Sequence, residues 1–104
     1  MDNLYERTLL FDFYGELLTP HRKTVYEMVV MEDRSLSEVA EECGISRQGV
    51  HDLVKRINKQ LVDYEDKLHL VGRFLDMKNK VSRIASLTDN EEIKRLAEEI
   101  LEEL

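Results

Sequence analysis

The chain has 104 residues and a formal net charge of −7, which excludes a uniformly basic coat for nucleic acid. It is long enough to bury a core without help, and its single cysteine excludes an intrachain disulfide. One proline and four glycines are too few for the many turns of a sandwich or barrel. Charged residues interrupt every apolar run, and the start lacks the basic residues of a signal peptide. We expect an all-α, soluble, cytoplasmic protein forming one structural domain overall.

The first predicted helix spans about Leu4 to Leu18 and is apolar over more than one face. A helix with so wide an apolar arc is usually buried on two sides. Two interpretations stay open at this point: a central core helix within the monomer, or part of a subunit interface.

A second helix is predicted to begin after Thr19, because Thr19 is a suitable N-cap and Pro20 suits the first helical position. Its apolar residues Val25, Met28 and Val29 have helical spacing, and it should end near Met31.

Two further helices are predicted in quick succession. Ser35 and Glu38 fit a capping box, in which each side chain binds a free backbone amide at the helix start. Gly44 suits the left-handed position that ends a helix, and Ser46 suits the N-cap of the next one. The predicted inner face of that next helix consists of Val50, Leu53, Val54, Ile57 and Leu61.

Beyond Leu61 the helical pattern continues toward Leu87, with Gly72 as the expected point of a bend. A second capping box is predicted at Thr88 and Glu91, opening a final helix. The apolar stripe of that helix comprises Ile93, Leu96, Ala97, Ile100, Leu101 and Leu104, and its other side is strongly acidic.

The stretch from Leu36 to Lys55 has the spacing of a helix-turn-helix. Ala40 provides a small residue where the helices cross, Gly44 provides the turn, and Ile45 provides an apolar plug after it. The remaining apolar contacts between the two helices should come from Val39, Cys43, Val50 and Leu53. The second helix of such a pair can enter a DNA major groove, although the same unit also serves purely structural or protein-binding roles.

The segment from Ser46 to Gln60 carries four basic residues and one acidic residue, a local net charge of +3 in an acidic chain. The predicted nucleic-acid-binding residues are Ser46, Arg47, Gln48, His51, Lys55, Arg56 and Lys59, with Asp52 beside them. In this prediction Arg47 reads guanine, Gln48 reads adenine, and Ser46 meets a phosphate. Arg56 and Lys59 would hold the phosphate backbone. The alternative is an ordinary solvated helix face.

No sequence motif predicts an enzyme or a cofactor. The three histidines are far apart and have no CxxC companion, so we expect no metal site. Cys43 occupies a position typical of a small core residue. Phosphate-binding, dinucleotide-binding and nucleophile-elbow motifs are absent from the sequence.

Several motifs together resemble the YlxM family of small bacterial proteins. They are LFDFYGELLT from Leu10, SLSEVAEE from Ser35, GISRQGVHD from Gly44, and the pair Lys55-Arg56, and the resemblance covers about residues 4–70. The helix-turn-helix also resembles region 4 of sigma factors. The resemblance implies an all-helical DNA-binding protein with a regulatory link to the signal recognition particle, because the family's genes neighbour that of the particle's GTPase.

Three interpretations of function follow and stay open here. The first is a nucleic-acid-binding regulator that acts on DNA or RNA through residues 46–60. The second is an accessory factor that binds the GTPase or the RNA of the signal recognition particle. The third is a dimerisation module, in which the apolar residues of segments 57–75 and 93–104 pair across a two-fold axis. For the organisation of the chain we expect a helix-turn-helix domain at 1–68 and a helical extension packed on it at 69–104.

Overall fold

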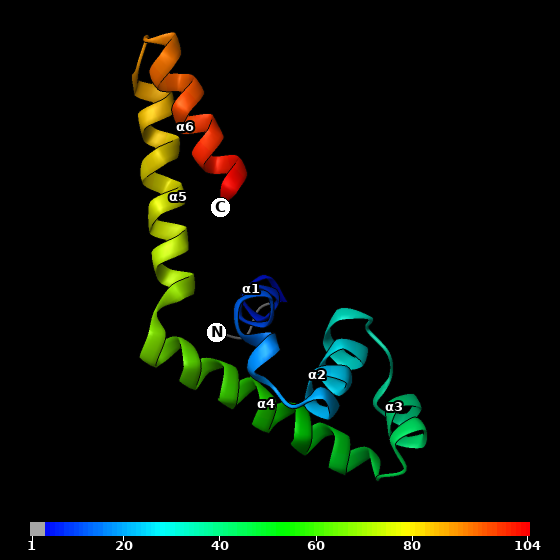
Figure 1. Ribbon diagram of the computed structural model, residues 1–104. Helices are drawn as coiled ribbons and strands as arrows, with labels where there is room; N and C mark the ends of the chain where they lie inside the picture. Colours follow the sequence, from blue (N-terminus) through cyan, green and yellow to red (C-terminus); the bar gives the residue numbers. More distant parts are fainter. Residues whose placement is uncertain (1–3) are drawn as a thin grey trace. The chain divides into compact units, whose positions relative to one another are not determined.

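The computed structural model describes residues 4–104, which form helices and connecting loops without a β-strand (Figure 1). Its α-helices are α1 (Leu4–Tyr14), α2 (Pro20–Tyr26), α3 (Leu36–Cys43), α4 (Arg47–Leu68), α5 (Leu70–Leu87) and α6 (Glu91–Glu103). The predicted all-α class is confirmed. The chain divides into two compact units, Met1–Leu68 and His69–Leu104.

Helix α1 packs against the rest of the first unit through aromatic side chains. Tyr14 is fully buried and its hydroxyl donates a hydrogen bond to Oε1 of Glu65 on α4. Phe11 stacks on Tyr26 with ring centroids 5.3 Å apart. The α-helix ends at Tyr14 and a 3₁₀ turn, Gly15–Leu17, follows it, so the last predicted turn is wound more tightly than expected.

Helix α2 begins as predicted, with the Thr19 side chain accepting a hydrogen bond from the Arg22 amide at 3.3 Å. The helix does not continue as a regular α-helix to Met31. Residues Glu27–Met31 form a π-helical turn, in which the Glu32 amide donates to the Glu27 carbonyl at 2.8 Å. Single π turns of this kind often lie at functional sites.

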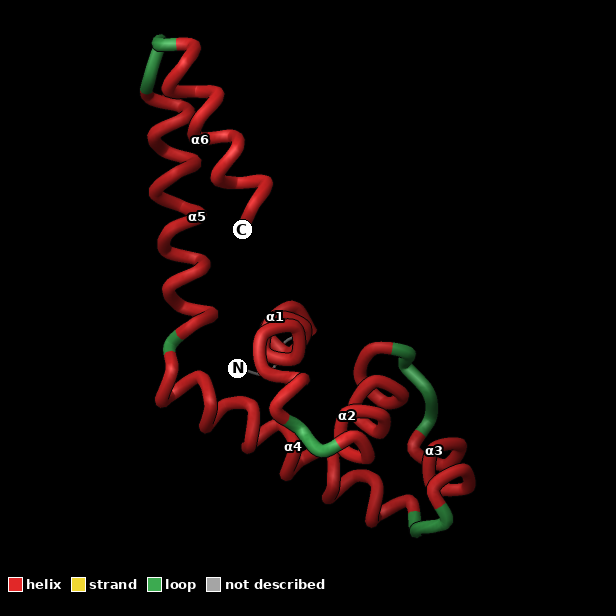
Figure 2. The backbone as a smooth tube through the Cα atoms, in the orientation of Figure 1, coloured by secondary structure: helices red, strands yellow, loops and turns green. Residues whose placement is uncertain are grey.

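Helices α3 and α4 form the predicted helix-turn-helix, joined by a short loop (Figure 2). Gly44 has φ +68° and ends α3 in the left-handed conformation, as expected. Ser35 caps α3 by accepting from the Glu38 amide at 3.1 Å. The Glu38 carboxylate accepts from the Ser35 hydroxyl, whereas the capping box predicted a bond to a backbone amide.

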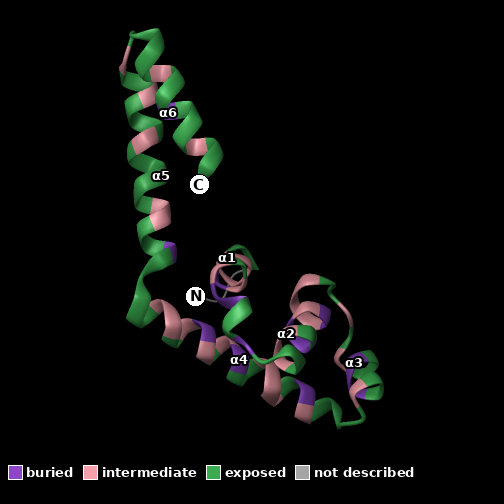
Figure 3. Ribbon diagram, viewed as in Figure 1, coloured by how far each residue is buried: buried purple, intermediate pink, exposed green. Residues whose placement is uncertain are grey.

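The core of the helix-turn-helix lies between α2, α3 and α4 (Figure 3). Its buried residues are Val25, Met28, Val39, Ala40 and Val50, with Val29, Leu36, Cys43, Leu53 and Val54 packed against them. Ile45 is a correction to the sequence prediction: it is 41% exposed rather than a buried plug. It lies in the turn between the two helices, where its side chain covers Gly49 at 3.7 Å from the position of an added Cβ.

In the second unit, α5 and α6 pack against each other. The helix break falls at His69, whose φ is +56°, and not at Gly72, which lies within the first turn of α5. The cap of α6 is Asn90, whose Oδ1 accepts from the amides of Glu92 and Ile93 at 2.9 and 3.1 Å. The prediction that Thr88 caps this helix is therefore wrong; the Thr88 hydroxyl accepts a hydrogen bond from the Asn90 amide at 3.1 Å.

The apolar stripe of α6 is only partly covered. Ala97 is buried and Leu101 is half-buried, whereas Ile93, Leu96 and Ile100 are 42–48% exposed. The predicted packing of this extension on the helix-turn-helix stays a prediction.

Candidate nucleic-acid interface

All seven predicted site residues lie on α4 from Arg47 to Lys59 or at its N-cap, and all are exposed. Arg47, His51 and Lys55 follow one another at intervals of four residues, so they form one column on the helix surface. Gln48 and Arg56 lie in the neighbouring column. The predicted set thus forms one continuous surface, which we call the α4 face: residues 46–48, 51, 52, 55, 56 and 59.

The start of α4 presents free backbone amides. Ser46 caps the helix by accepting a hydrogen bond from the Gly49 amide at 2.9 Å, as the sequence predicted. The first amides of a helix have no partner within it, and together with the helix dipole they favour an anion. The Ser46 hydroxyl hydrogen remains able to donate to a phosphate oxygen.

Gly49 fits closely against this cap. A Cβ at Gly49 would lie 3.1 Å from the Ser46 hydroxyl oxygen. The glycine therefore leaves room for the capping side chain, which gives it a local role that the sequence alone did not indicate.

Asp52 orients two of the predicted base-reading residues. It accepts a hydrogen bond from Gln48 Nε2 at 3.0 Å, and its Oδ1 lies 3.5 Å from Nδ1 of His51. The Gln48 hydrogen bond, followed by that of His51, lowers the pKa of Asp52, so this carboxylate stays charged near neutral pH. Gln48 keeps its second N–H and its carbonyl oxygen for a partner such as an adenine edge.

The cations of the α4 face are largely unpaired. Among residues 4–104, Arg47, Lys55 and Arg56 form no ion pair, and Lys59 contacts Asp63 at 3.4 Å on the exposed surface. Exposed pairs of this kind contribute little stability, so Lys59 can exchange its partner for a phosphate at small cost. The α4 face can therefore supply up to four cations to a polyanion.

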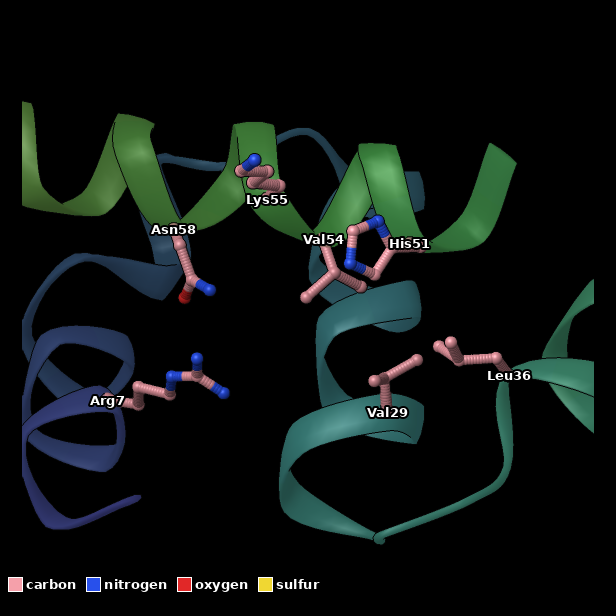
Figure 4. Close-up of a pocket in the computed structure, with 7 residues that line it drawn as sticks. All are labelled: Arg7, Val29, Leu36, His51, Val54, Lys55 and Asn58. Atoms are coloured by element: carbon pink, nitrogen blue, oxygen red, sulfur yellow. The ribbon is translucent and has the colours of Figure 1, made fainter. Parts of the chain in front are cut away.

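A pocket beside the α4 face contains two residues that the sequence prediction missed, Arg7 and Asn58 (Figure 4). It has a volume of about 430 Å³ and is shared with His51 and Lys55. The only sequence feature that could have drawn attention to Arg7 is that it is the single basic residue among the first 18. Its proximity to α4 depends on tertiary packing and could not be deduced from spacing.

The described residues hold no group of three or more His, Cys, Asp or Glu side chains arranged for a metal ion. Within the same range, no helix has the length and apolar character needed to cross a membrane.

Sequence comparison identifies the family. Residues 1–104 match the family described as "Putative helix-turn-helix protein, YlxM / p13 like", designated UPF0122. A UPF0122 protein of Acetivibrio thermocellus is 41% identical, with 98% of this chain and 97% of that protein covered. A Thermoanaerobacter sp. (strain X514) relative is 40% identical over 99% and 94% of the two chains. A Bacillus thuringiensis relative is 40% identical over 88% and 87%. This chain belongs to the UPF0122 family of YlxM/p13-like helix-turn-helix proteins.

Proposed function

We propose that this protein is a regulator that binds nucleic acid through the α4 face. The observation that carries the proposal is the exposed start of α4 in a helix-turn-helix, with three cations that form no ion pair among residues 4–104. Lys and Arg that are free of internal partners can neutralise phosphates without first losing a salt bridge. The family description, a helix-turn-helix protein, agrees with this role and names no enzyme activity.

Duplex DNA is the ligand that this geometry favours. The major groove of B-DNA admits an α-helix, whereas the major groove of an RNA helix is too deep and narrow. Arg47, Gln48 and His51 occupy the first turns of α4, where recognition helices contact base edges. RNA would have to be bound through its shape or through a single-stranded loop.

The test is an equilibrium binding measurement by fluorescence anisotropy, with a labelled DNA duplex and a labelled RNA hairpin. Arg47→Ala combined with Lys55→Ala should weaken binding by about tenfold or more, since two cations in contact with the nucleic acid are lost. Lys23→Ala combined with Lys67→Ala removes the same charge from the first unit outside the α4 face. Equal losses for the two double variants, or none for the first, would refute the proposal.

A second candidate function concerns the signal recognition particle, to which the resemblance to YlxM proteins links this chain. The supporting observation is the acidic surface of α6, which carries six glutamates against Lys94 and Arg95. Arg95 is already paired with Glu92 and Glu99, at 3.3 and 2.9 Å. Such a helix suits a basic protein, as RNA-binding proteins commonly are. A pull-down at low salt that recovers neither the particle's GTPase nor its RNA would contradict this function.

We also propose that the second unit pairs with a second copy of the chain. Helix α5 carries four basic residues against one acidic residue, a net charge of +3, whereas α6 carries a net charge of −4. A two-fold axis would place α5 of each copy beside α6 of the other, so that opposite charges face each other. The exposed apolar residues available for this pairing are Met77, Ile84, Leu87, Ile93, Leu96, Ile100 and Leu104.

Analytical ultracentrifugation tests the pairing. The unmodified chain should sediment as a dimer, and Leu96→Glu combined with Ile100→Glu should shift it to a monomer, because buried charges without partners are costly. Leu4→Glu combined with Leu17→Glu, on exposed residues of the first unit, is the matched control. A monomeric unmodified chain would contradict the proposal.

A further inference from the structure

The pocket beside the α4 face lies entirely within the first unit, where α1, the π-helical turn, α3 and α4 meet. Its lining residues are Arg7, Val29, Leu36, His51, Val54, Lys55 and Asn58. The volume of about 430 Å³ is within the range of small-ligand sites. Figure 4 shows the Arg7 guanidinium pointing from α1 toward Asn58 on α4.

Arg7 has an unsatisfied donor at this pocket. Its Nε is buried and has no hydrogen-bond partner, and its guanidinium forms no ion pair with any residue in the 4–104 range. Arginine cannot lose its proton in a protein, so the charge persists. A buried donor without a partner lowers stability, and native structures rarely keep one unless water or a ligand satisfies it. An acceptor bound in the pocket would therefore meet a guanidinium whose charge no lining carboxylate offsets.

Asn58 adds a second donor whose orientation is fixed. The Tyr26 hydroxyl donates a hydrogen bond to Oδ1 of Asn58. Burial raises the pKa of Tyr26, so the hydroxyl keeps its proton and remains the donor. The acceptor atom of Asn58 is therefore occupied, and its amide nitrogen turns toward the pocket, as Figure 4 shows.

The remaining walls complete a site for an anion with an apolar portion. Lys55 forms no ion pair with a described residue and contributes a second positive charge, and His51 lies one turn before it on α4. Val29, Leu36 and Val54 supply apolar surface. No carboxylate lines the pocket.

We propose that this pocket binds a phosphate group. Two positive charges match a phosphate dianion better than a single carboxylate, and the Arg7 fork with the Asn58 amide and Lys55 can serve several phosphate oxygens at once. The phosphate could belong to a free phosphorylated small molecule or to the backbone of a bound nucleic acid. Since His51 and Lys55 also belong to the α4 face, a free ligand would compete with nucleic acid, a consequence that rests on the proposed function.

The experiment is an NMR titration of the full chain that follows the Arg7 Nε–H and Asn58 Nδ2–H signals. The probes are inorganic phosphate, adenosine 5′-monophosphate, adenosine, and a DNA duplex. We expect saturable shifts of both signals with phosphate or the monophosphate and none with adenosine. Shifts with the duplex alone would assign the phosphate to the nucleic-acid backbone. No shift with any phosphate-bearing probe, or equal shifts with adenosine, would overturn the proposal.

Two variants separate this pocket from the α4 face. Arg7→Gln should weaken phosphate binding by about tenfold or more, because the charge-assisted hydrogen bonds are lost. Arg47→Gln is the matched control: it should leave the Arg7 and Asn58 shifts unchanged while weakening duplex binding. If the unmodified chain does not bind the duplex but the phosphate-induced shifts occur, the phosphate-binding proposal is supported and the proposed nucleic-acid function is refuted. The titration of the unmodified chain tests phosphate binding in the pocket even if Arg7→Gln does not fold.

Discussion

The strength of nucleic-acid binding should depend steeply on salt, and the α4 face sets the slope. Arg47, Lys55, Arg56 and Lys59 can each displace a counterion from DNA. Each neutralised phosphate contributes about −0.9 to the slope of log K against log salt concentration, so four contacts give a slope of about −3.6 per subunit. If Lys59 keeps its contact with Asp63, three cations remain and the slope falls to about −2.7. Between 50 and 200 mM salt, these slopes correspond to losses of roughly 150-fold and 40-fold.

Anisotropy titrations at several salt concentrations measure this slope directly. Arg47→Ala combined with Lys55→Ala should halve the larger value to about −1.8, whereas Lys23→Ala combined with Lys67→Ala should leave it unchanged. A slope near zero for the unmodified chain would refute the reasoning, because the bound surface would then carry no cations in contact with phosphate. An unchanged slope in the first double variant would place the contacts elsewhere on the molecule.

Two further predictions concern the helix-turn-helix and its site. Gly44→Ala should destabilise the fold by about 1 kcal/mol, because alanine is strained at φ +68°. Gly49→Ala should gain less than the about 1 kcal/mol that alanine ordinarily contributes inside a helix, because its Cβ would lie 3.1 Å from the capping hydroxyl of Ser46. Urea unfolding measures both, and a full gain at Gly49 would contradict the argument that glycine leaves room for the cap. The pKa of Asp52 is lower in the folded chain than its ordinary value of 3.8, so its contribution to stability is present above that value and is lost as the pH falls through the folded-state pKa. The stability difference between the unmodified chain and Asp52→Asn should therefore be constant at about pH 5–7 and vanish in stronger acid, and a difference that grew on acidification would contradict the assigned direction.

The parts of the fold that depend on neighbours in sequence were predictable. Thr19, Ser35 and Ser46 cap helices as expected, and Gly44 ends α3 in the left-handed conformation. Each of these features needs only a side chain and an amide three residues away, or a residue without a Cβ. The apolar spacing then sufficed to predict the helix-turn-helix core around Val39 and Val50.

The sequence predictions were wrong where two nearby residues could each form the same local feature, such as a helix break or a helix cap. Gly72 was the expected break because glycine weakens a helix, yet His69 takes the left-handed conformation and α5 runs through Gly72. At the start of α6, both Thr88 and Asn90 can cap a helix, and the structure uses Asn90 for two amides at once. The π-helical turn at Glu27–Met31 has no signal in apolar spacing, since five residues are too few to separate it from an α-helix.

The pocket beside the α4 face could not be predicted from sequence patterns. Arg7 and Asn58 are separated by most of the first unit and meet only because α1 packs on α4. Two aromatic contacts set that packing: Tyr14 is joined to Glu65 near the end of α4, and Phe11 stacks on Tyr26. Tyr26 in turn holds Asn58, so the residue that positions α1 also orients the second donor of the pocket. One set of contacts thus fixes both donors relative to Lys55, a residue of the α4 face. For this reason a ligand at Arg7 would act on the nucleic-acid surface without any movement of the helix-turn-helix itself.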